Sequence, residues 1–435
     1  MIHSKYSYFS PLILSWKLSQ AFVDAYLIYL GIVFDPSSGQ NLKELEKTVR
    51  TRIQTMFDER FRHEDFINAL SDTVAVFSDF AKYTGSSQIY QNFSNLFSIW
   101  NNTLIEPIRD TYWRTPSHKI CEIEKYSLFR YDRATVDRRN SSAGDIQTPL
   151  LIVYSFINRH YILDLLPEVS IVRSFLKQGF DIFATEWGTP GPYDRELTIG
   201  HFVNEYMDKS VDFIRNITKS DKVSILGYCW GGNLVLSYAA LHPEKVKNIL
   251  TIATPGDAQA DDVILSVWTK RMNVDALLDA FGNVPSVLLN AAFALRSPIE
   301  YLHKYPHFFE EAHDFESMLE FFATETWLQD SLPVIGEIFR EFVKGYYQQN
   351  LFIRNQMRMD EAEVDLSKIS APFLNVVASR DDLVAPASSK ALNDVVGSND
   401  KSLIEHHSGH VGLIIGERAH KEVWPTVGKW LRERS

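Results

Sequence analysis

Residues 223–233, VSILGYCWGGN, place a cysteine in a turn between a short apolar run and a glycine-rich segment. The run that ends at residue 228 has the pattern of a buried strand, and the residues that follow the turn have that of a helix. A strand, then Gly-x-nucleophile-x-Gly, then a helix is the nucleophile elbow, a tight turn that lifts a side chain above a sheet. Gly227 and Gly231 suit it because neighbouring backbone comes close there. The stretch therefore predicts that Cys229 is a nucleophile.

The segments around this turn alternate between the two regular structures. Short apolar runs predict strands, and amphipathic stretches predict helices. The strands are expected at 149–157, 181–187, 222–228, 246–255 and 371–379, and the helices at 170–180, 197–218 and 231–243. Such alternation predicts a mostly parallel sheet with helices on both faces. With the elbow, it predicts the α/β-hydrolase fold.

Three regions are expected in the chain. Residues 1–115 form a helical N-terminal region, residues 116–256 and 366–435 form the catalytic core, and residues 257–365, rich in aromatic side chains, form an inserted helical cap or lid. Within the first region, 11–34 is apolar but interrupted by charged residues, which favours an amphipathic helix over a membrane-spanning one. Such a helix either packs on its own domain or a second subunit, or contacts a hydrophobic surface.

Composition narrows the function classes. The formal net charge of −11 argues against nonspecific nucleic-acid binding, which needs a basic surface. The two cysteines, Cys121 and Cys229, exclude a disulfide framework and fit a reducing compartment, the cytoplasm.

The remaining catalytic groups are expected downstream of the nucleophile, because in this fold the acid and the histidine follow it along the chain. Asp381 and Asp382 come just past the strand at 371–379, and His410 follows a glycine in a loop before the last helix. The expected triad is Cys229, Asp382 and His410. A metal site at His406, His407 and His410 is the alternative, but no further ligand cluster accompanies it, so no metal is expected.

Two backbone amides are expected to hold the oxyanion. One belongs to the residue after the nucleophile, Trp230, and the other to the loop after the first strand of the parallel sheet. That second donor is Ile157, with Asn158 as the alternative. The alternative is that the polar residues of this loop only stabilise its turn, with Arg159 paired to Asp164.

Several spaced motifs resemble polyhydroxyalkanoate synthases. They are residues 154–190, YSFINRHYILDLLPEVSIVRSFLKQGFDIFATEWGTP; 227–232, GYCWGG; 379–386, SRDDLVAP; 408–416, SGHVGLIIG; and 423–431, VWPTVGKWL. The resemblance covers about residues 120–435 and is greatest to the short synthases that work with a second subunit. His160 stands where those enzymes commonly have a proline, Glu186 where they have an aspartate, and Trp230 follows the nucleophile.

The resemblance implies an acyltransferase that polymerises (R)-3-hydroxyacyl-coenzyme A, such as the 3-hydroxybutyryl thioester, through an acyl group on Cys229. It favours Asp382 as the acid, because this residue precedes the apolar-x-x-Pro segment of the family pattern. No cofactor is implied, since coenzyme A is part of the substrate and a product, and its binding residues are not identified. The implied partners are the polymer granule surface in the cytoplasm, a second copy of the chain and a second synthase subunit.

Two other functions share part of this pattern. A cysteine-dependent α/β hydrolase, such as an acyl-coenzyme A thioesterase or a dienelactone-type enzyme, would use the same triad. A noncatalytic protein that coats polymer granules would use the apolar segments, but it needs no nucleophile. A cysteine suits the polymerase, because a thiolate that attacks a thioester forms another thioester and keeps the acyl group activated.

Overall fold

The computed structural model describes residues 115–135, 144–297, 320, 323–325, 327–328 and 330–435. The account that follows concerns the compact unit to which Trp113–Arg296 and Thr324–Ser435 belong. The amphipathic helix predicted at 11–34 lies outside the described residues, as does nearly all of the predicted region 1–115. Among the described residues, no helix is both long and apolar enough to cross a membrane.

A mixed sheet of eight strands forms the centre of the unit, in the order β1-β2-β4-β3-β5-β6-β9-β10. The strands from β4 to β10 are parallel, and β2 joins β4 in antiparallel fashion. The strands are β1 (Ser117–Ile123), β2 (Tyr126–Tyr131), β3 (Leu150–Val153), β4 (Ile182–Glu186), β5 (Val223–Tyr228), β6 (Val246–Ile252), β9 (Phe373–Ala378) and β10 (Lys401–His406). The predicted mostly parallel sheet is confirmed.

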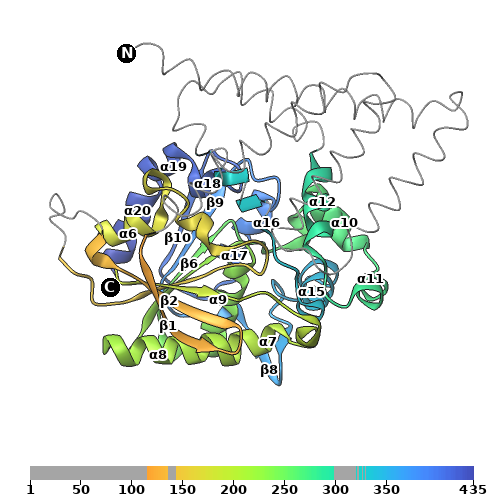
Figure 1. The fold of residues 1–435 in the computed structure, drawn as a ribbon, viewed down its shortest axis with the longest axis horizontal. Helices are drawn as coiled ribbons and strands as arrows, with labels where there is room; N and C mark the ends of the chain where they lie inside the picture. The colour runs from red at the N-terminus through yellow and green to blue at the C-terminus, as the bar shows by residue number, and fades with distance from the viewer. Residues whose placement is uncertain (1–114, 136–143, 298–319, 321–322, 326, 329) are drawn as a thin grey trace, which may run out of the picture. The chain divides into compact units, whose positions relative to one another are not determined.

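Helices cover both faces of this sheet. The helices of the sheet domain are α6 (Ile171–Lys177), α7 (Ile199–His201), the π-helix η6 (Phe202–Met207), α8 (Asp208–Thr218), α9 (Trp230–Leu241), α16 (Pro386–Lys390), α17 (Leu392–Val395), α18 (Gly412–Ile415), α19 (Glu417–Glu422) and α20 (Trp424–Arg432). Figure 1 shows α8 along one side of the sheet and α6 next to α20 on the other. The rings of Phe175 and Trp424 meet edge to face between α6 and α20, at 6.2 Å.

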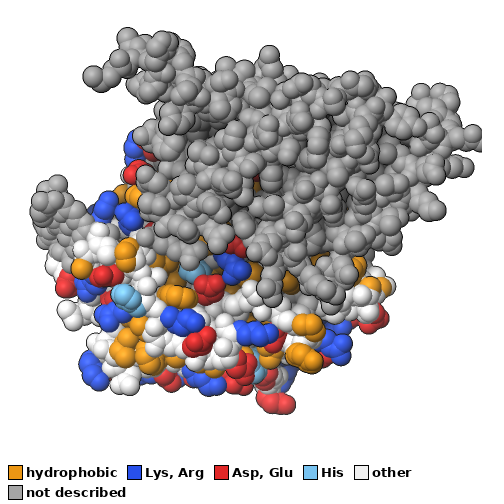
Figure 2. Space-filling view, in the orientation of Figure 1, with side chains coloured by type: hydrophobic (Ala, Val, Ile, Leu, Met, Phe, Trp, Pro, Cys, Tyr) orange, Lys and Arg blue, Asp and Glu red, His pale blue; other side chains and the backbone are white. Residues whose placement is uncertain are grey.

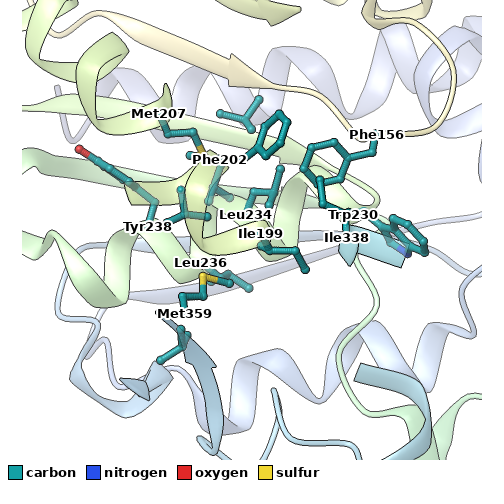
Figure 3. Packing of buried hydrophobic residues seen from close by; sticks show 14 of the residues in the cluster. Phe156, Ile199, Phe202, Met207, Trp230, Leu234, Leu236, Tyr238, Ile338 and Met359 are labelled. Atoms are coloured by element: carbon teal, nitrogen blue, oxygen red, sulfur yellow. The ribbon is translucent and has the colours of Figure 1, made fainter. Parts of the chain in front are cut away.

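A hydrophobic cluster fills the face covered by α8 and α9. Alternate strand residues such as Leu151, Val153 and Ile225 belong to it, while the intervening Leu150 and Ile152 are buried on the opposite face. This alternation follows from the two-residue repeat of a strand. In Figure 3, Phe156 and Trp230 lie at one end of the cluster, Tyr238 lies at the other, and Phe202 lies between them.

An antiparallel hairpin extends the sheet beyond the strands that the sequence predicted. β1 pairs with β2 from Ser117 opposite Tyr131 to Ile123 opposite Tyr126. Residues of β1 such as His118 and Lys119 are exposed, and few of its side chains enter the core. The segment therefore lacks the continuous apolar run by which the buried strands were predicted.

The turn between β5 and α9 has the geometry of an elbow. Cys229 has φ 54° and ψ −126°, a conformation that non-glycine residues rarely adopt. A Cβ on Gly227 would lie 2.2 Å from the carbonyl oxygen of Gly231, and one on Gly231 would lie 2.2 Å from that of Val153. The backbone can fold back this tightly only because both positions lack a side chain.

A helical insertion separates β6 from β9 in the chain. Its described helices are α10 (Ile264–Arg271), α11 (Val274–Phe281), α12 (Ser286–Arg296), α15 (Gly336–Glu341) and the π-helix η9 (Phe342–Gln348). A small hairpin, β7 (Met357–Met359) with β8 (Ala362–Val364), follows. Figure 1 shows α10, α11, α12 and α15 grouped together. The domain boundaries expected at residues 115, 256 and 365 stay predictions.

Replacing Gly227 with alanine should destabilise the protein by about 3 kcal/mol or more, because the new methyl group meets rigid backbone rather than a movable side chain. The matched control is Gly144→Ala, since a Cβ at Gly144 has no heavy atom within 4 Å. Chemical denaturation of both variants measures the difference. Equal stability of the two would contradict the close approach at the elbow.

Candidate active site

Cys229 and His410 meet above the carboxyl ends of the central strands. Cys229 directly follows β5, and its amide donates to the carbonyl oxygen of Ile252 on the neighbouring β6 at 2.9 Å. His410 lies in the turn between β10 and α18, only 5% exposed, and its ring forms a hydrogen bond with the Cys229 side chain. The partly buried thiol thus has a base in direct contact.

The carboxylate that holds His410 is that of Asp381. Nδ1 of His410 and Oδ2 of Asp381 lie 2.7 Å apart, and the Asp381 side chain is 2% exposed. The amides of Leu383 and Val384 both donate to Oδ1 of Asp381 at 2.9 Å. These two bonds fix the carboxylate so that its second oxygen faces the imidazole, which leaves Nε2 of His410 for the sulfur.

The choice of Asp382 as the acid is therefore wrong. Its side chain is 48% exposed and pairs with Arg296 at the end of α12. Consecutive residues in the turn after β9 send their side chains in different directions, so only one of the two can face His410. Both aspartates follow the same strand, and the family pattern does not encode which one turns inward.

The electrostatics of the site favour a charged imidazole. Burial alone would lower the pKa of His410, but the carboxylate of Asp381, the Cys229 group and the hydrogen bonds to both raise it to about 10. A carboxylate close to an imidazolium stabilises the charged form. His410 is thereby suited to take a proton from the thiol and to hold it next to the sulfur.

The two predicted oxyanion donors differ in their surroundings. The amide of Trp230 opens α9, where helix geometry provides no intrahelical acceptor, so it is available to an oxyanion. The amide of Ile157 donates to Oγ of Ser155 at 3.0 Å. Its neighbour Asn158 has φ 60°, and Oδ1 of Asn158 accepts a hydrogen bond from Ser331 at 2.5 Å. The role of Ile157 stays a prediction.

An aromatic wall contributed by the insertion lies against the elbow. The indole of Trp230 stacks on Phe342 of η9, with ring centroids 3.9 Å apart and planes 10° apart. Nε1 of Trp230 donates to the hydroxyl of Tyr347 at 3.3 Å. π-Helices occur often at functional sites, and here η9 presents both aromatic residues to the side chain that follows the nucleophile.

The loop after β3 is tied to the insertion by charge. Arg159 donates to Glu186 at 3.1 Å and to Asp330 at 3.0 Å. Arg159 does not pair with Asp164, the alternative interpretation of this loop, because the Asp164 carboxylate binds Thr115 and Ser170.

The two residues of this region that depart from the family pattern lie against each other. Nδ1 of His160 is 3.5 Å from Oε2 of Glu186, the carboxylate that also binds Arg159.

Asp261 is a buried carboxylate near the site that the sequence analysis did not predict. Asp261 is 1% exposed, and its Oδ1 accepts from the amide of Ala385 at 3.4 Å. In the described part of the chain, its Oδ2 is buried without a hydrogen-bond partner. Burial raises its pKa to about 6, a rise that the amides of Ala385 and Val263 and the charge of Lys270 reduce and the charge of Asp381 adds to. An aspartate in an acidic loop gave no reason to expect this.

The histidines of the 406–410 segment contact different partners. His406 lies 3.4 Å from Glu422, and Nδ1 of His407 lies 3.1 Å from Oγ of Ser379. No group of three or more potential metal ligands occurs among the described residues.

Charges of both signs are mixed on the described surface. On the face seen in Figure 2, Lys and Arg side chains are interspersed with Asp and Glu.

The fold and the site together define an α/β hydrolase that carries a cysteine at the elbow of β5 and α9. Residues 148–417 match a family model described as the alpha/beta hydrolase fold. This match confirms the fold predicted from the elbow and the alternating strands and helices.

Similar proteins of known name identify the family within the α/β hydrolases. The poly(3-hydroxyalkanoate) polymerase subunit PhaC of Allochromatium vinosum is 38% identical over 322 residues, which span 74% of this chain and 89% of that protein. The subunit of the same name from Haloferax mediterranei is 39% identical over 326 residues, or 74% of this chain and 65% of that protein. The chain belongs to the family of poly(3-hydroxyalkanoate) polymerase subunits, PhaC, within the α/β hydrolases.

Replacing Asp381 with asparagine should lower kcat by about 10²–10⁴-fold, because His410 loses the charge that orients it and stabilises its protonated form. The same substitution should lower the pKa of His410, so the pH–rate profile should shift toward acid. Asp382→Asn is the matched control. It breaks only a half-exposed ion pair, which contributes at most about 1 kcal/mol, and should leave the rate within a few fold. A larger loss of rate in Asp382→Asn than in Asp381→Asn would instead identify Asp382 as the acid of the triad.

Asp261→Asn should stabilise the protein at pH 8 by about 3 kcal/mol. The folded protein holds the proton of Asp261 up to about pH 6, whereas the unfolded chain loses it near pH 4, so stability falls as the pH rises between these values. Asparagine removes that penalty and keeps an oxygen for the Ala385 amide. Denaturation at pH 4.5 and pH 8 measures the effect, which should be much smaller at pH 4.5. A variant less stable than the native protein at pH 8 would mean that the carboxylate has a stabilising partner.

Proposed function

We propose that the protein polymerises (R)-3-hydroxyacyl-coenzyme A, with 3-hydroxybutyryl-coenzyme A as the first substrate to test, and releases coenzyme A. The observation that carries the proposal is the Cys229–His410–Asp381 array at the elbow of a chain in the PhaC family. Polymerase subunits of this kind are acyltransferases, and the array contains the nucleophile and base that acyl transfer needs.

In the first half of the cycle, the acyl group moves onto the enzyme. His410 takes the proton from Cys229, and the thiolate attacks the thioester carbonyl of the substrate. The negative charge that develops on the carbonyl oxygen is held by the Trp230 amide, together with a second donor from the loop after β3. The bond between the carbonyl carbon and the coenzyme A sulfur then breaks, and the leaving thiolate takes the proton from His410.

In the second half, the chain grows by one ester. The 3-hydroxyl of another acyl unit gives its proton to His410 and attacks the acyl-Cys229 thioester. The carbon–sulfur bond to Cys229 breaks, and the sulfur regains a proton from His410. Asp381 keeps the imidazole oriented and stabilises its charge in both halves. Because an oxoester is less activated than a thioester, the transfer of the acyl group from Cys229 to a hydroxyl lowers the free energy. An acyl-serine is already an oxoester, so the same transfer from a serine would gain almost nothing.

The surroundings of Cys229 favour acyl transfer over hydrolysis. The stack of Trp230 on Phe342, the Tyr347 hydroxyl on the indole and the buried rings of Tyr154 and Tyr228 place aromatic groups beside the nucleophile. A polymerase must keep water from its acyl-enzyme. This wall supports the polymerase over the thioesterase, which needs water in the same place.

The setting of the reaction follows from its chemistry. The protein would act in the cytoplasm at the surface of its own polymer granules, with no cofactor, since the substrate brings the activated acyl group. A hydrophobic product favours attachment through apolar segments, for which residues 11–34 are the sequence's candidate. A second copy of the chain and a second synthase subunit are the proposed protein partners.

Incubation of the protein with (R)-3-hydroxybutyryl-coenzyme A tests the function directly. Coenzyme A release should be accompanied by polymer rather than by free 3-hydroxybutyrate. Cys229→Ala should abolish turnover and leave the fold intact, and Cys229→Ser should form at most a slow acyl-enzyme, because a hydroxyl is the poorer nucleophile at neutral pH.

Cys121→Ala is the matched control, since Cys121 lies on β1 at the sheet edge and should be dispensable. Free 3-hydroxybutyrate as the main product would show that the protein is a thioesterase rather than a polymerase. Polymer bound without any release of coenzyme A would instead indicate a granule coat. Full activity of Cys229→Ala would remove Cys229 from the mechanism.

A further inference from the structure

A cavity of about 580 Å³ lies next to the aromatic wall of the site. Its lining comes from the segment before α10, from the end of α10 and from the end of η9 with the turn that follows, and includes Ala258, Lys270, Tyr347, Gln349 and Arg354. The volume is within the range of small-molecule sites. The mechanism proposed above uses none of these side chains.

The cavity adjoins the nucleophile through one residue. Tyr347 lines the cavity, and its hydroxyl accepts from Nε1 of Trp230 at 3.3 Å. Trp230 directly follows Cys229, and the Cys229 group contributes to raising the pKa of the Tyr347 phenol, after burial and Asp261. A ligand that reaches from Cys229 past Tyr347 would therefore enter this space.

Two cations of the lining are available to an anion. Nζ of Lys270 donates to the carbonyl oxygen of Asp261 at 2.5 Å, and the guanidinium of Arg354 is exposed. Neither forms an ion pair with a carboxylate within 4 Å in the part of the chain that the structure describes. In this chain of net charge −11, two basic groups without such a partner at one cavity are suited to phosphate, which both side chains bind well.

Two other polar side chains of the lining, those of Gln348 and Asn350, form hydrogen bonds within the protein. The Gln348 side chain donates to the carbonyl oxygens of Thr269 and Met272, and so closes the end of α10. Asn350 is likewise engaged, with Ala258 and Asp257. These contacts hold the cavity walls together, so that the cations are carried on a fixed frame.

We propose that this cavity binds the phosphate-bearing nucleotide end of the coenzyme A thioester, with Lys270 and Arg354 as its phosphate ligands. The inference rests on the proposed function, since it assigns a place to the leaving group of that reaction. The thioester carbon must be at Cys229, and the phosphates are many bonds away. A cationic cavity beside the nucleophile, rather than around it, fits that separation.

The test compares two thioesters that differ only at the nucleotide end. 3-Hydroxybutyryl-coenzyme A carries the phosphates, and 3-hydroxybutyryl-pantetheine does not. Lys270→Gln should raise KM for the first about tenfold, the equivalent of one charged hydrogen bond. The more exposed Arg354→Gln should raise it about threefold. Both variants should leave kcat, and all constants for the pantetheine thioester, within twofold of the native protein.

Arg271→Gln and Arg358→Gln are the matched controls. Each removes one positive charge from an exposed residue a few positions from a cavity ligand, yet neither residue lines the cavity. Both should keep the native KM for the two thioesters. The pantetheine reaction also shows that a Lys270 or Arg354 variant has folded with an intact nucleophile.

The outcomes separate the two proposals. A native protein that polymerises neither thioester overturns the proposed function itself. If it polymerises both, but the Lys270 and Arg354 variants keep the native KM for the coenzyme A thioester, the cavity is not the phosphate site. An equal rise in KM for both thioesters, or the same rise in the Arg271 and Arg358 controls, also overturns the inference.

Discussion

The tight turn at Cys229 is the constraint on which the rest of the site depends. Its positive φ directs the thiol away from the sheet, and the contacts of Gly227 and Gly231 with neighbouring backbone allow β5 and α9 to meet at that angle. The same turn leaves the first amide of α9 without an intrahelical partner. The proposed nucleophile and oxyanion donor are thus consecutive residues of one tight turn, positioned by backbone packing rather than by side-chain contacts.

The other groups reach this turn from elements far apart in the sequence. Asp381 and His410 follow the adjacent strands β9 and β10, so the parallel register of those strands sets their distance. The insertion reaches the elbow through Phe342 and Tyr347, and it reaches the loop after β3 through Asp330 and Arg159. The strand ends carry Cys229, Asp381 and His410, and the insertion packs against the turn that holds Cys229.

Much of this arrangement was predictable from local sequence. The apolar runs gave the buried strands, and the elbow gave Cys229, because both are encoded by residues next to each other. Asp381 could not be told from Asp382, since the direction of each side chain depends on amides two and three residues ahead and on Arg296, 86 positions away. The roles of Asp261 and Tyr347 likewise depend on contacts across the fold. The hairpin of β1 and β2 was missed because an edge strand with exposed residues lacks a clear apolar pattern.

The π-helix η9 makes the length of its segment as important as its composition. Each residue of an α-helix advances the chain by about 100° around the axis, and each residue of the wider π-helix by somewhat less, so loss of a single residue would rotate everything beyond it by nearly that angle. Tyr347 would then turn away from Trp230, and Gln348 would leave the end of α10. The segment Phe342–Gln348 should accept many substitutions at Lys344, whose amine pairs with Asp275, but few insertions or deletions. Evolution of this region is therefore expected to proceed by exchange of residues at constant length.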